Sequence, residues 1–322
     1  MTGFSHLYTS GVEIDQSIWD GVCSTRGRLM NRILLTRIED LWMREGLRGI
    51  ARHLFRRPSP RQKFITRHAL KTGRGLEIEP GNGGLALKAK GFHVETLGYA
   101  DTDTSHEKNP IAGVDIGGID HADHTWHGEP LSVAVGHMTW YDWIIASHVI
   151  EKTPDFAGFL IECEALLRPN GKLVLAVPDK RHCFDHVQSL TSTGDVLDAL
   201  SLRRTRIAPG RVFDHHANAV RKGRNAISWH RYAMGRLHPI HEMKEARHAW
   251  QKALNGENYI DVHNWYFTPQ SFRLLIEDLS ALGLIGLSIV DGPTSSGGEF
   301  YVCLHRSDAT ANQSARSPRR ML

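Results

Sequence analysis

Cysteine is scarce in this chain of 322 residues, and the four that occur, Cys23, Cys163, Cys183 and Cys303, are widely separated. Their spacing matches neither a zinc ribbon nor the framework of a disulfide-stapled domain. No apolar run approaches the length of a membrane-spanning helix. The first residues, MTGFSHLYTSGVEID, lack a basic stretch followed by an apolar core. We therefore expect no signal peptide and a cytoplasmic protein.

A strong excess of charge is also missing, because the formal net charge is only +4 at pH 7. Hydrophobic residues make up 41% and charged residues 23%, as in ordinary globular proteins. Arginines recur between residues 26 and 57 beside apolar residues at roughly helical spacing. A solvated basic face is the favoured interpretation, with an anionic membrane or nucleic acid as the alternative. We expect no nucleic-acid partner, and the sequence does not decide between a monomer and an oligomer.

Histidine, in contrast, is abundant, with 20 residues. Segments such as FDHHANAV and LHPIHEMKEARHAW raise the hypothesis of a metal site, since imidazoles bind zinc or iron. Their spacings match no H-E-x-x-H or Cys/His framework. We therefore expect no metal, and assign these histidines to packing, capping or substrate contact.

From residue 75 onward, apolar strands alternate with helices. The strands GLEIE, HVETLGY, DWIIASHV and GKLVLAVP and the helix FAGFLIECEALLR predict a doubly wound, mostly parallel α/β sheet. After a helix in FTPQSFRLLIEDLSALGL, the strands IGLSIVDG and EFYVCLHR predict a C-terminal antiparallel hairpin.

The pattern divides the chain into four parts. We predict a helical segment over residues 1–65, a core over residues 66–180 and 262–307, and a disordered tail over residues 308–322. Residues 181–261 are too long for an ordinary connection and carry apolar residues at helical spacing. We predict that they form a partly helical insertion that covers the site.

The glycine-rich stretch LEIEPGNGGLA follows the first strand. Gly81 and Gly83 permit a tight turn and a close approach of backbone to a ligand, and GNGGLA matches the dinucleotide fingerprint G-x-G-x-x-A. Asp101 lies at a suitable distance downstream to accept from a ribose hydroxyl. Ser147 and His148 end a central strand, where α/β sheets place their ligands. Together these features predict a nucleotide-like ligand.

These motifs, with YDWIIASHVIEKTPD and ALLRPNGKLVLAVPDKR in the same order, resemble class I S-adenosylmethionine-dependent methyltransferases. The resemblance covers about residues 70 to 180 and 262 to 306, and implies a Rossmann-like seven-stranded sheet with S-adenosyl-L-methionine as cofactor. Within the superfamily, ASHVIE, PDKRHCFDH and DVHNWYFTPQSF are similar to a bacterial subgroup often associated with glycosyltransferase systems.

The resemblance also implies roles for particular residues. Gly81 and Gly83 would pass close to the methionine part of the cofactor, Asp101 would take the ribose hydroxyls, and Asp123, after a short third strand, would contact adenine. Ser147 and His148 would line the methyl-transfer side. The motif also assigns Glu77 and Glu79 to the cofactor site. Glu79 replaces the first glycine of the motif, and Gly98 occupies the usual position of the acid after the second strand.

Transfer to a hydroxyl or an amine requires loss of a proton, so a base is expected. We predict His148 as the base, with His182 and His263 as further catalytic candidates. For the acceptor we predict contacts from Asp179, Arg181 and His215. Arg181 would hold a carboxylate or phosphate in a bidentate manner, or else brace its loop against an aspartate.

The predicted function is methyl transfer to an oxygen or nitrogen of a polar small molecule or a glycan. A nicotinamide-dependent oxidoreductase is one alternative, supported only by G-x-G-x-x-A. A module that binds the cofactor without catalysis is the other, supported by Glu79, Gly98 and Lys152, where the subgroup has a second histidine.

Overall fold

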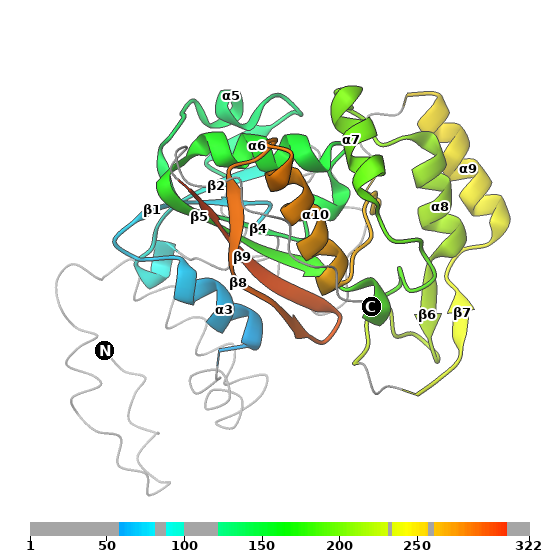
Figure 1. Cartoon of the computed structure of the whole chain (residues 1–322). Coiled ribbons are helices and arrows are strands. Elements are labelled where there is room, and N and C mark those ends of the chain that lie inside the picture. The colour runs from blue at the N-terminus through cyan, green and yellow to red at the C-terminus, as the bar shows by residue number, and fades with distance from the viewer. Residues whose placement is uncertain (1–57, 81–87, 100–121, 231–233, 257–260, 308–322) are drawn as a thin grey trace, which may run out of the picture. The chain divides into compact units, whose positions relative to one another are not determined.

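The computed structural model describes residues 58–80, 88–99, 122–230, 234–256 and 261–307 (Figure 1). Gly81, Gly83 and Asp101 lie outside these ranges, as do the predicted helices of residues 26–57 and the predicted disordered tail.

A seven-stranded sheet forms the centre of the described chain, in the order β3-β2-β1-β4-β5-β9-β8. Its strands are β1 (Arg74–Ile78), β2 (His93–Tyr99), β3 (His124–Trp126), β4 (Tyr141–Ser147), β5 (Leu167–Pro178), β8 (Leu287–Ser296) and β9 (Glu299–Arg306). Strands β1 to β5 are parallel, and β9 is antiparallel to both of its neighbours. The predicted doubly wound sheet with its C-terminal hairpin is therefore confirmed.

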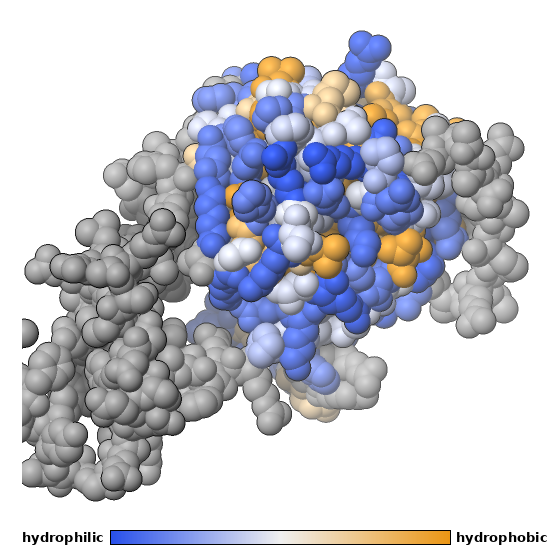
Figure 2. Space-filling model, turned by 90° about the vertical axis from the view of Figure 1, so that its left-hand side faces the viewer, coloured by the Kyte–Doolittle hydropathy of each residue, from blue (hydrophilic) through white to orange (hydrophobic). Residues whose placement is uncertain are grey.

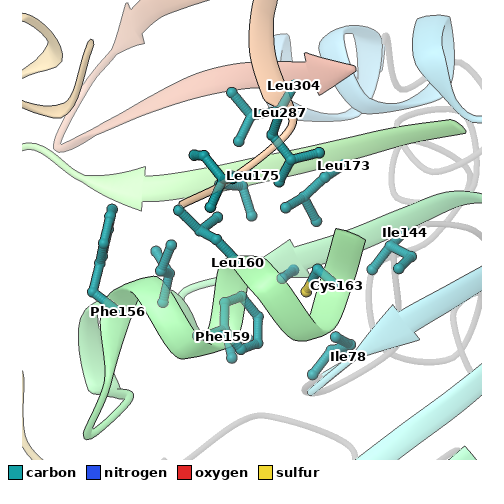
Figure 3. Close-up of a cluster of buried hydrophobic side chains, with 14 of the residues drawn as sticks. Ile78, Ile144, Phe156, Phe159, Leu160, Cys163, Leu173, Leu175, Leu287 and Leu304 are labelled. Carbon is teal, nitrogen blue, oxygen red and sulfur yellow. The ribbon is translucent and has the colours of Figure 1, made fainter. Parts of the chain in front are cut away.

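Both faces of the sheet are buried, which explains why its central strands read as continuous apolar runs. On β5, Leu173 and Leu175 belong to one hydrophobic cluster, and Val174 and Ala176 belong to the other. The first cluster lies under α6 (Phe156–Leu166), as Figure 3 shows, and extends to α10 (Pro269–Ala281). The second contains residues of α3 (Pro60–His68). The molecule thus has helices on both sides of one sheet.

Helix α3 changes a predicted boundary. Its Phe64 and Ile65 are buried against β5 and β9, and the compact unit begins at Ser59. The core therefore starts before residue 66, because the apolar face of α3 is part of its packing. Ser59 caps the helix by accepting from the backbone N–H of Gln62, and Pro60 occupies the first helical turn.

Helix α10 begins with a capped first turn. Thr268 accepts from the backbone N–H of Ser271, and Pro269 opens the helix. Earlier in the chain, the short 3₁₀ helix η1 (Lys88–Lys90) ends before Gly91, whose φ of 80° suits glycine. Cys163, Cys183 and Cys303 are buried free thiols.

The segment between β5 and α10 is partly helical. It contains α7 (Thr193–Ser201), α8 (Pro209–Asn218), α9 (Met243–Leu254) and a small antiparallel pair, β6 (Val220–Lys222) with β7 (Leu237–Pro239). Figure 1 shows α8, α9 and this pair gathered to one side of the large sheet. Short helices η2 (Ile150–Lys152) and η3 (Lys180–His182) follow β4 and β5.

Among the described residues, no helix is long and apolar enough to cross a bilayer. Figure 2 shows mostly hydrophilic residues on the face toward the viewer, with hydrophobic ones scattered between them.

Candidate active site

The carboxyl ends of β1 and β4 lie side by side at the point where the strand order reverses. From β1 the chain proceeds outward through β2 and β3, and then returns to β4 on the opposite side of β1. Because Ile78 pairs with Ala146, the next residues, Glu79 and Ser147, meet at this edge. Open α/β sheets bind their ligands at such a switch point.

Glu79 takes the backbone conformation of the glycine that it replaces. Its φ is 52°, in the left-handed region that favours glycine. Its carboxylate accepts from the backbone N–H of Tyr99 at the end of β2. Glu79 therefore brings a carboxylate from β1 to the end of the neighbouring strand, where Gly98 has no side chain to offer.

Asp123 does not lie where we expected it. It precedes β3 instead of following it, and its carboxylate accepts from Lys88 Nζ at 2.5 Å and from the backbone N–H of Thr96 at 2.8 Å. Thr96 is in the middle of β2, so Asp123 lies away from the carboxyl edge. The expectation of a contact to adenine is therefore corrected, because this carboxylate joins β2 to η1.

A cavity of about 350 Å³ opens at the carboxyl ends of β4 and β5. Pockets for small molecules usually fall in the range of about 300–1,000 Å³. The lining residues come from strand ends, from the insertion and from the hairpin turn: His148, Lys152, Pro178, Cys183, Phe184, Ile227, Ser228, His263, Ser296, Gly298 and Glu299. The insertion therefore contributes to the same cavity as His148.

His148 lies between two carboxylates. Its Nε2 is 2.8 Å from Glu299 Oε2, and its Nδ1 is 3.4 Å from Glu151 Oε1. Burial disfavours the imidazolium, but Glu151 and Glu299 outweigh it and raise the pKa of His148 from 6.5 to about 9. The residue also has a φ of 56°, a strained conformation that is uncommon outside glycine.

This environment makes His148 a poor base at neutral pH, and its catalytic assignment stays a prediction. With its pKa raised to about 9, the imidazole already carries its second proton at neutral pH and accepts no further one. Both ring nitrogens of His148 lie within 3.4 Å of a carboxylate oxygen, whereas His263 has one such contact at 2.7 Å and its Nε2 is 3.8 Å from the nearest one. His148 is thus a fixed positive charge at the edge of the cavity.

His263 has the geometry that a base requires. Its Nδ1 is 2.7 Å from Asp185 Oδ2, which holds the proton of the neutral ring on Nδ1 and leaves Nε2 as the acceptor. The backbone is fixed as well, since the N–H of His263 donates to His215 Nδ1 at 3.1 Å and its carbonyl accepts from the Tyr266 hydroxyl at 2.8 Å. The ring is buried in the wall of the cavity.

His215 supports His263 and does not line the cavity. Burial first, and the neighbouring histidines next, lower the pKa of His215 to about 3. It is therefore neutral, and since its Nδ1 accepts a hydrogen bond, its proton is on Nε2. The predicted substrate contact is corrected, because the ring faces its histidine neighbours: His216 at 5.3 Å and His263 at 5.7 Å between ring centroids.

Asp179 and Arg181 form a brace. The guanidinium Nε and Nη2 donate to Asp179 at 2.9 and 2.6 Å, so the bidentate edge of Arg181 is already occupied. Asp179 is fully buried. Of the two interpretations left open, the structure thus agrees with the loop brace. His182 follows on η3 and is not among the residues that line the cavity, and its catalytic assignment stays a prediction.

Lys152 lines the cavity and forms an ion pair with Asp261. Its Nζ is 2.7 Å from Asp261 Oδ1. Burial lowers the pKa of Lys152, but Asp261, Glu151 and Glu79 together raise it above its usual value. A lysine that holds its proton this firmly is no base.

A metal site is not found among the described residues, where no group of three or more histidine, cysteine or acidic side chains suits an ion. The sequence did reveal two site histidines, but it missed Glu151 and Glu299. Glu151 follows His148 by three residues, the spacing of neighbours on a helical turn. Glu299 begins a strand antiparallel to β5, and the start of such a strand lies at the carboxyl edge, opposite Pro178.

A model of the methyltransferase domain family matches residues 50–279. The chain belongs to this methyltransferase family. The match decides against the oxidoreductase alternative. No curated protein matches the chain.

Several solved structures are similar to the chain at low identity. The CurJ carbon methyltransferase is 14% identical with a TM-score of 0.33, and the match covers 73% of this chain but only 49% of that one. A possible histamine N-methyltransferase from Thermotoga maritima is 12% identical with a TM-score of 0.37, covering 83% of this chain and 99% of that one. A 1,6-didemethyltoxoflavin-N1-methyltransferase from Burkholderia thailandensis is 9% identical with a TM-score of 0.35, covering 92% of each. At these values the likenesses carry no information on the acceptor.

S-adenosylmethionine is the cofactor of this enzyme, and the residues at the strand switch fit it. Ser147 Oγ is buried there with no hydrogen-bond partner among the described residues. An unpaired buried hydroxyl is costly, so a ligand that bonds to it would relieve the cost. Glu79 offers a carboxylate at the same edge, suited to an ammonium or to ribose hydroxyls. Glu77 is buried on β1, and its assignment to the cofactor stays a prediction, as do those of Gly81, Gly83 and Asp101.

Proposed function

We propose that the enzyme transfers a methyl group to an oxygen or nitrogen of a polar small molecule, or of a single unit of a glycan, bound in the cavity beside His148 and His263. The observation that carries this proposal is the hydrogen bond of 2.7 Å between His263 Nδ1 and Asp185 Oδ2 in the cavity wall. A histidine oriented by a buried carboxylate is a recurrent arrangement for removing a proton from a nucleophile.

Each residue then has a defined task. S-adenosylmethionine supplies an electrophilic methyl group on a sulfonium. His263 Nε2 takes the proton of the acceptor's O–H or N–H, a bond forms between that atom and the methyl carbon, and the carbon–sulfur bond breaks. Asp185 keeps the ring in the productive tautomer. Phe184 and Ile227 give the cavity apolar walls that hold the acceptor in place.

The size and lining of the cavity support a small acceptor. A volume of about 350 Å³ is near the lower limit for small-molecule pockets. Its walls mix ionised groups, such as Glu299 and Lys152, with apolar ones, which suits a polar molecule more than a lipid. The likeness of several motifs to a subgroup associated with glycosyltransferase systems makes sugars the first class to test.

The test is turnover with the purified full chain, S-adenosylmethionine and a panel of amino sugars, nucleotide sugars, polyols and amines. We expect formation of S-adenosylhomocysteine and a methylated product. His263→Gln should lower kcat by about 100-fold or more, since loss of a general base costs about 10²–10⁴-fold. His238→Gln, on the exposed strand β7, is the matched control and should retain full activity.

Cofactor affinity separates the possible failures. If His263→Gln binds S-adenosylhomocysteine normally and still transfers methyl groups at the original rate, the assignment of the base is wrong. A chain that binds the cofactor but methylates no member of a broad panel would instead favour a binding module without catalysis.

A further inference from the structure

Glu151 is a buried carboxylate that the proposed reaction has not yet used. Its side chain is 0% exposed, and neither carboxylate oxygen has a hydrogen-bond partner among the described residues. Its backbone carbonyl accepts from the N–H groups of Asn264 and Trp265 at 2.7 and 3.1 Å. Buried charges without partners are rare because their desolvation is expensive. Something near Glu151 must therefore offset the cost of its charge.

Two imidazoles flank this carboxylate. Glu151 Oε1 lies 3.4 Å from His148 Nδ1 and 3.8 Å from His263 Nε2. Burial raises the pKa of Glu151, but His148, His263 and Lys152 lower it by a larger amount. Glu151 is therefore ionised, and its negative charge lies between the fixed imidazolium and the candidate base.

The position of this charge matters for His263. In the neutral ring, Nδ1 donates to Asp185, and the lone pair of Nε2 lies near the negative Oε1 of Glu151. That contact is repulsive. Once Nε2 has taken a proton, the same contact becomes an attraction between opposite charges in a medium of low dielectric constant. Glu151 thus favours the state that His263 reaches when the acceptor loses its proton.

We propose that Glu151 is a positioning residue of the transfer reaction, whose buried carboxylate lies between the rings of His148 and His263 and stabilises the proton that His263 takes from the acceptor. The inference rests on the proposed function, because it assigns to His263 the proton of the acceptor. Glu151 acts through the two histidines and touches no reacting atom.

Several groups surround His263. Of these, Glu151 is the charged group next to Nε2. Asp185 bonds to Nδ1 on the opposite side of the ring. His215, from α8, is neutral because its pKa is about 3, and Phe184 contacts the ring at 4.8 Å between centroids. Lys152 lines the same cavity as His263, and its charge is paired with Asp261.

The first experiment measures proton affinity directly, without any acceptor. The full chain is labelled with ¹⁵N-histidine, and the imidazole signals of His148 and His263 are assigned with the variants His148→Gln and His263→Gln. Glu151→Gln keeps the shape and removes the charge. We expect it to lower the titration midpoints of both histidines by about half a pH unit or more, because an opposite charge within 4–6 Å favours the charged ring.

Glu299→Gln is the matched control. Glu299 bonds to His148 Nε2 and, among the described residues, forms no hydrogen bond or ion pair with His263, so Glu299→Gln should lower the midpoint of His148 alone. If Glu151→Gln leaves the midpoint of His263 where it was, the proposal is overturned. Glu151→Asp retains the charge at a shorter reach, and its midpoints should lie between those of the unchanged chain and Glu151→Gln. This second variant keeps the test decisive if Glu151→Gln fails to fold.

The second experiment is the pH profile of methyl transfer. Glu151→Gln should reduce kcat by about tenfold, since a weaker base removes the proton less well, while KM changes little. Its acidic limb should move to lower pH, because His263 then loses its own proton more easily. An equal loss of rate at every pH would indicate a structural role and would overturn the proposal.

The two experiments separate this inference from the function on which it rests. Suppose that Glu151→Gln shifts the midpoints of His148 and His263 but the unchanged chain methylates no acceptor. The proposed function and the catalytic role of Glu151 would then both be contradicted, and only the electrostatic coupling between Glu151 and the two histidines would remain. Unshifted midpoints in an active enzyme would reject Glu151 and leave the proposed function standing.

Discussion

Two regions with different physical character form the two walls of the cavity. The sheet edge contributes ionised groups, His148 and Glu299, carried on strands that are buried on both faces. The insertion contributes Cys183, Phe184 and Ile227. Its helix α9 is mostly exposed, and most residues of α8 are half-buried. Helices α8 and α9 each bury a single residue, Val212 and Ala246. The comparison indicates that the sheet fixes charge and the insertion fixes shape.

The two regions also shift histidine pKa values in opposite directions. At the sheet edge, two carboxylates raise the pKa of His148 to about 9. In the insertion, burial among other histidines lowers the pKa of His215 to about 3. His148 is therefore positively charged at neutral pH, and His215 is neutral.

Replacing the insertion is the largest test of this division. A Gly/Ser linker in place of residues 190–255 should leave cofactor binding largely intact, because Glu79 and Ser147 belong to the sheet edge. It should abolish transfer, because Ile227 and the support of His263 by His215 are lost. Calorimetry with S-adenosylhomocysteine and the turnover assay measure the two effects. Loss of cofactor affinity in a folded variant would show that the insertion does more than shape the acceptor cavity.

We expect a smaller effect from replacing Glu79 at the sheet edge. Glu79→Gln should weaken S-adenosylhomocysteine binding by about tenfold, since one hydrogen bond to a charged group contributes about 1.5–3 kcal/mol and 1.4 kcal/mol is a factor of ten. Calorimetry measures the change. Glu245→Gln, the same substitution in the exposed helix α9, is the control and should bind normally. Tighter binding by Glu79→Gly would instead mean that the carboxylate obstructs the site.

The smallest effect is on stability as a function of pH. His148 has a folded pKa above its unfolded value of 6.5, so its contribution is complete below pH 6.5 and is lost as the pH rises through about 9. His215 has a depressed folded pKa, so its contribution is present above pH 6.5 and is lost as the pH falls toward 3. The side chain of His148 is 37% exposed, and solvent screening reduces its share.

Urea unfolding between pH 5 and 9.5 measures these contributions. His148→Gln should flatten the alkaline decline of the free energy of unfolding, and His215→Gln should flatten the acid decline. If the two variants exchanged these effects, the assignment of opposite charge states to the two regions would be wrong.

Much of the fold could be predicted from local sequence. The residues HVETLGY form β2 and EFYVCLHR form β9 with the predicted ends, because apolar, β-branched and aromatic residues are bounded there by turn residues. The boundary near residue 65 and the position of Asp123 were not predicted correctly. Both depend on packing: α3 joins the core only through contacts with β5 and β9, and β3 is too short to be placed by periodicity.

The site was predicted less completely. His148 and His263 could be found because strand ends and rejoining segments converge at the carboxyl edge of a parallel sheet. The sequence could not predict which of the two is better suited to act as the base. That depends on the carboxylates of Glu151, Glu299 and Asp185, which reach the two rings from different parts of the chain.

The sequence by itself determined the doubly wound sheet and its final hairpin, because hydrophobic period and turn residues are local properties of the chain. Tertiary structure alone decided the charge on each histidine. The carboxylates that raise the pKa of His148 come from residues 151 and 299, three and 151 positions away along the chain. Electrostatic interactions depend on distance in space, and folding sets that distance.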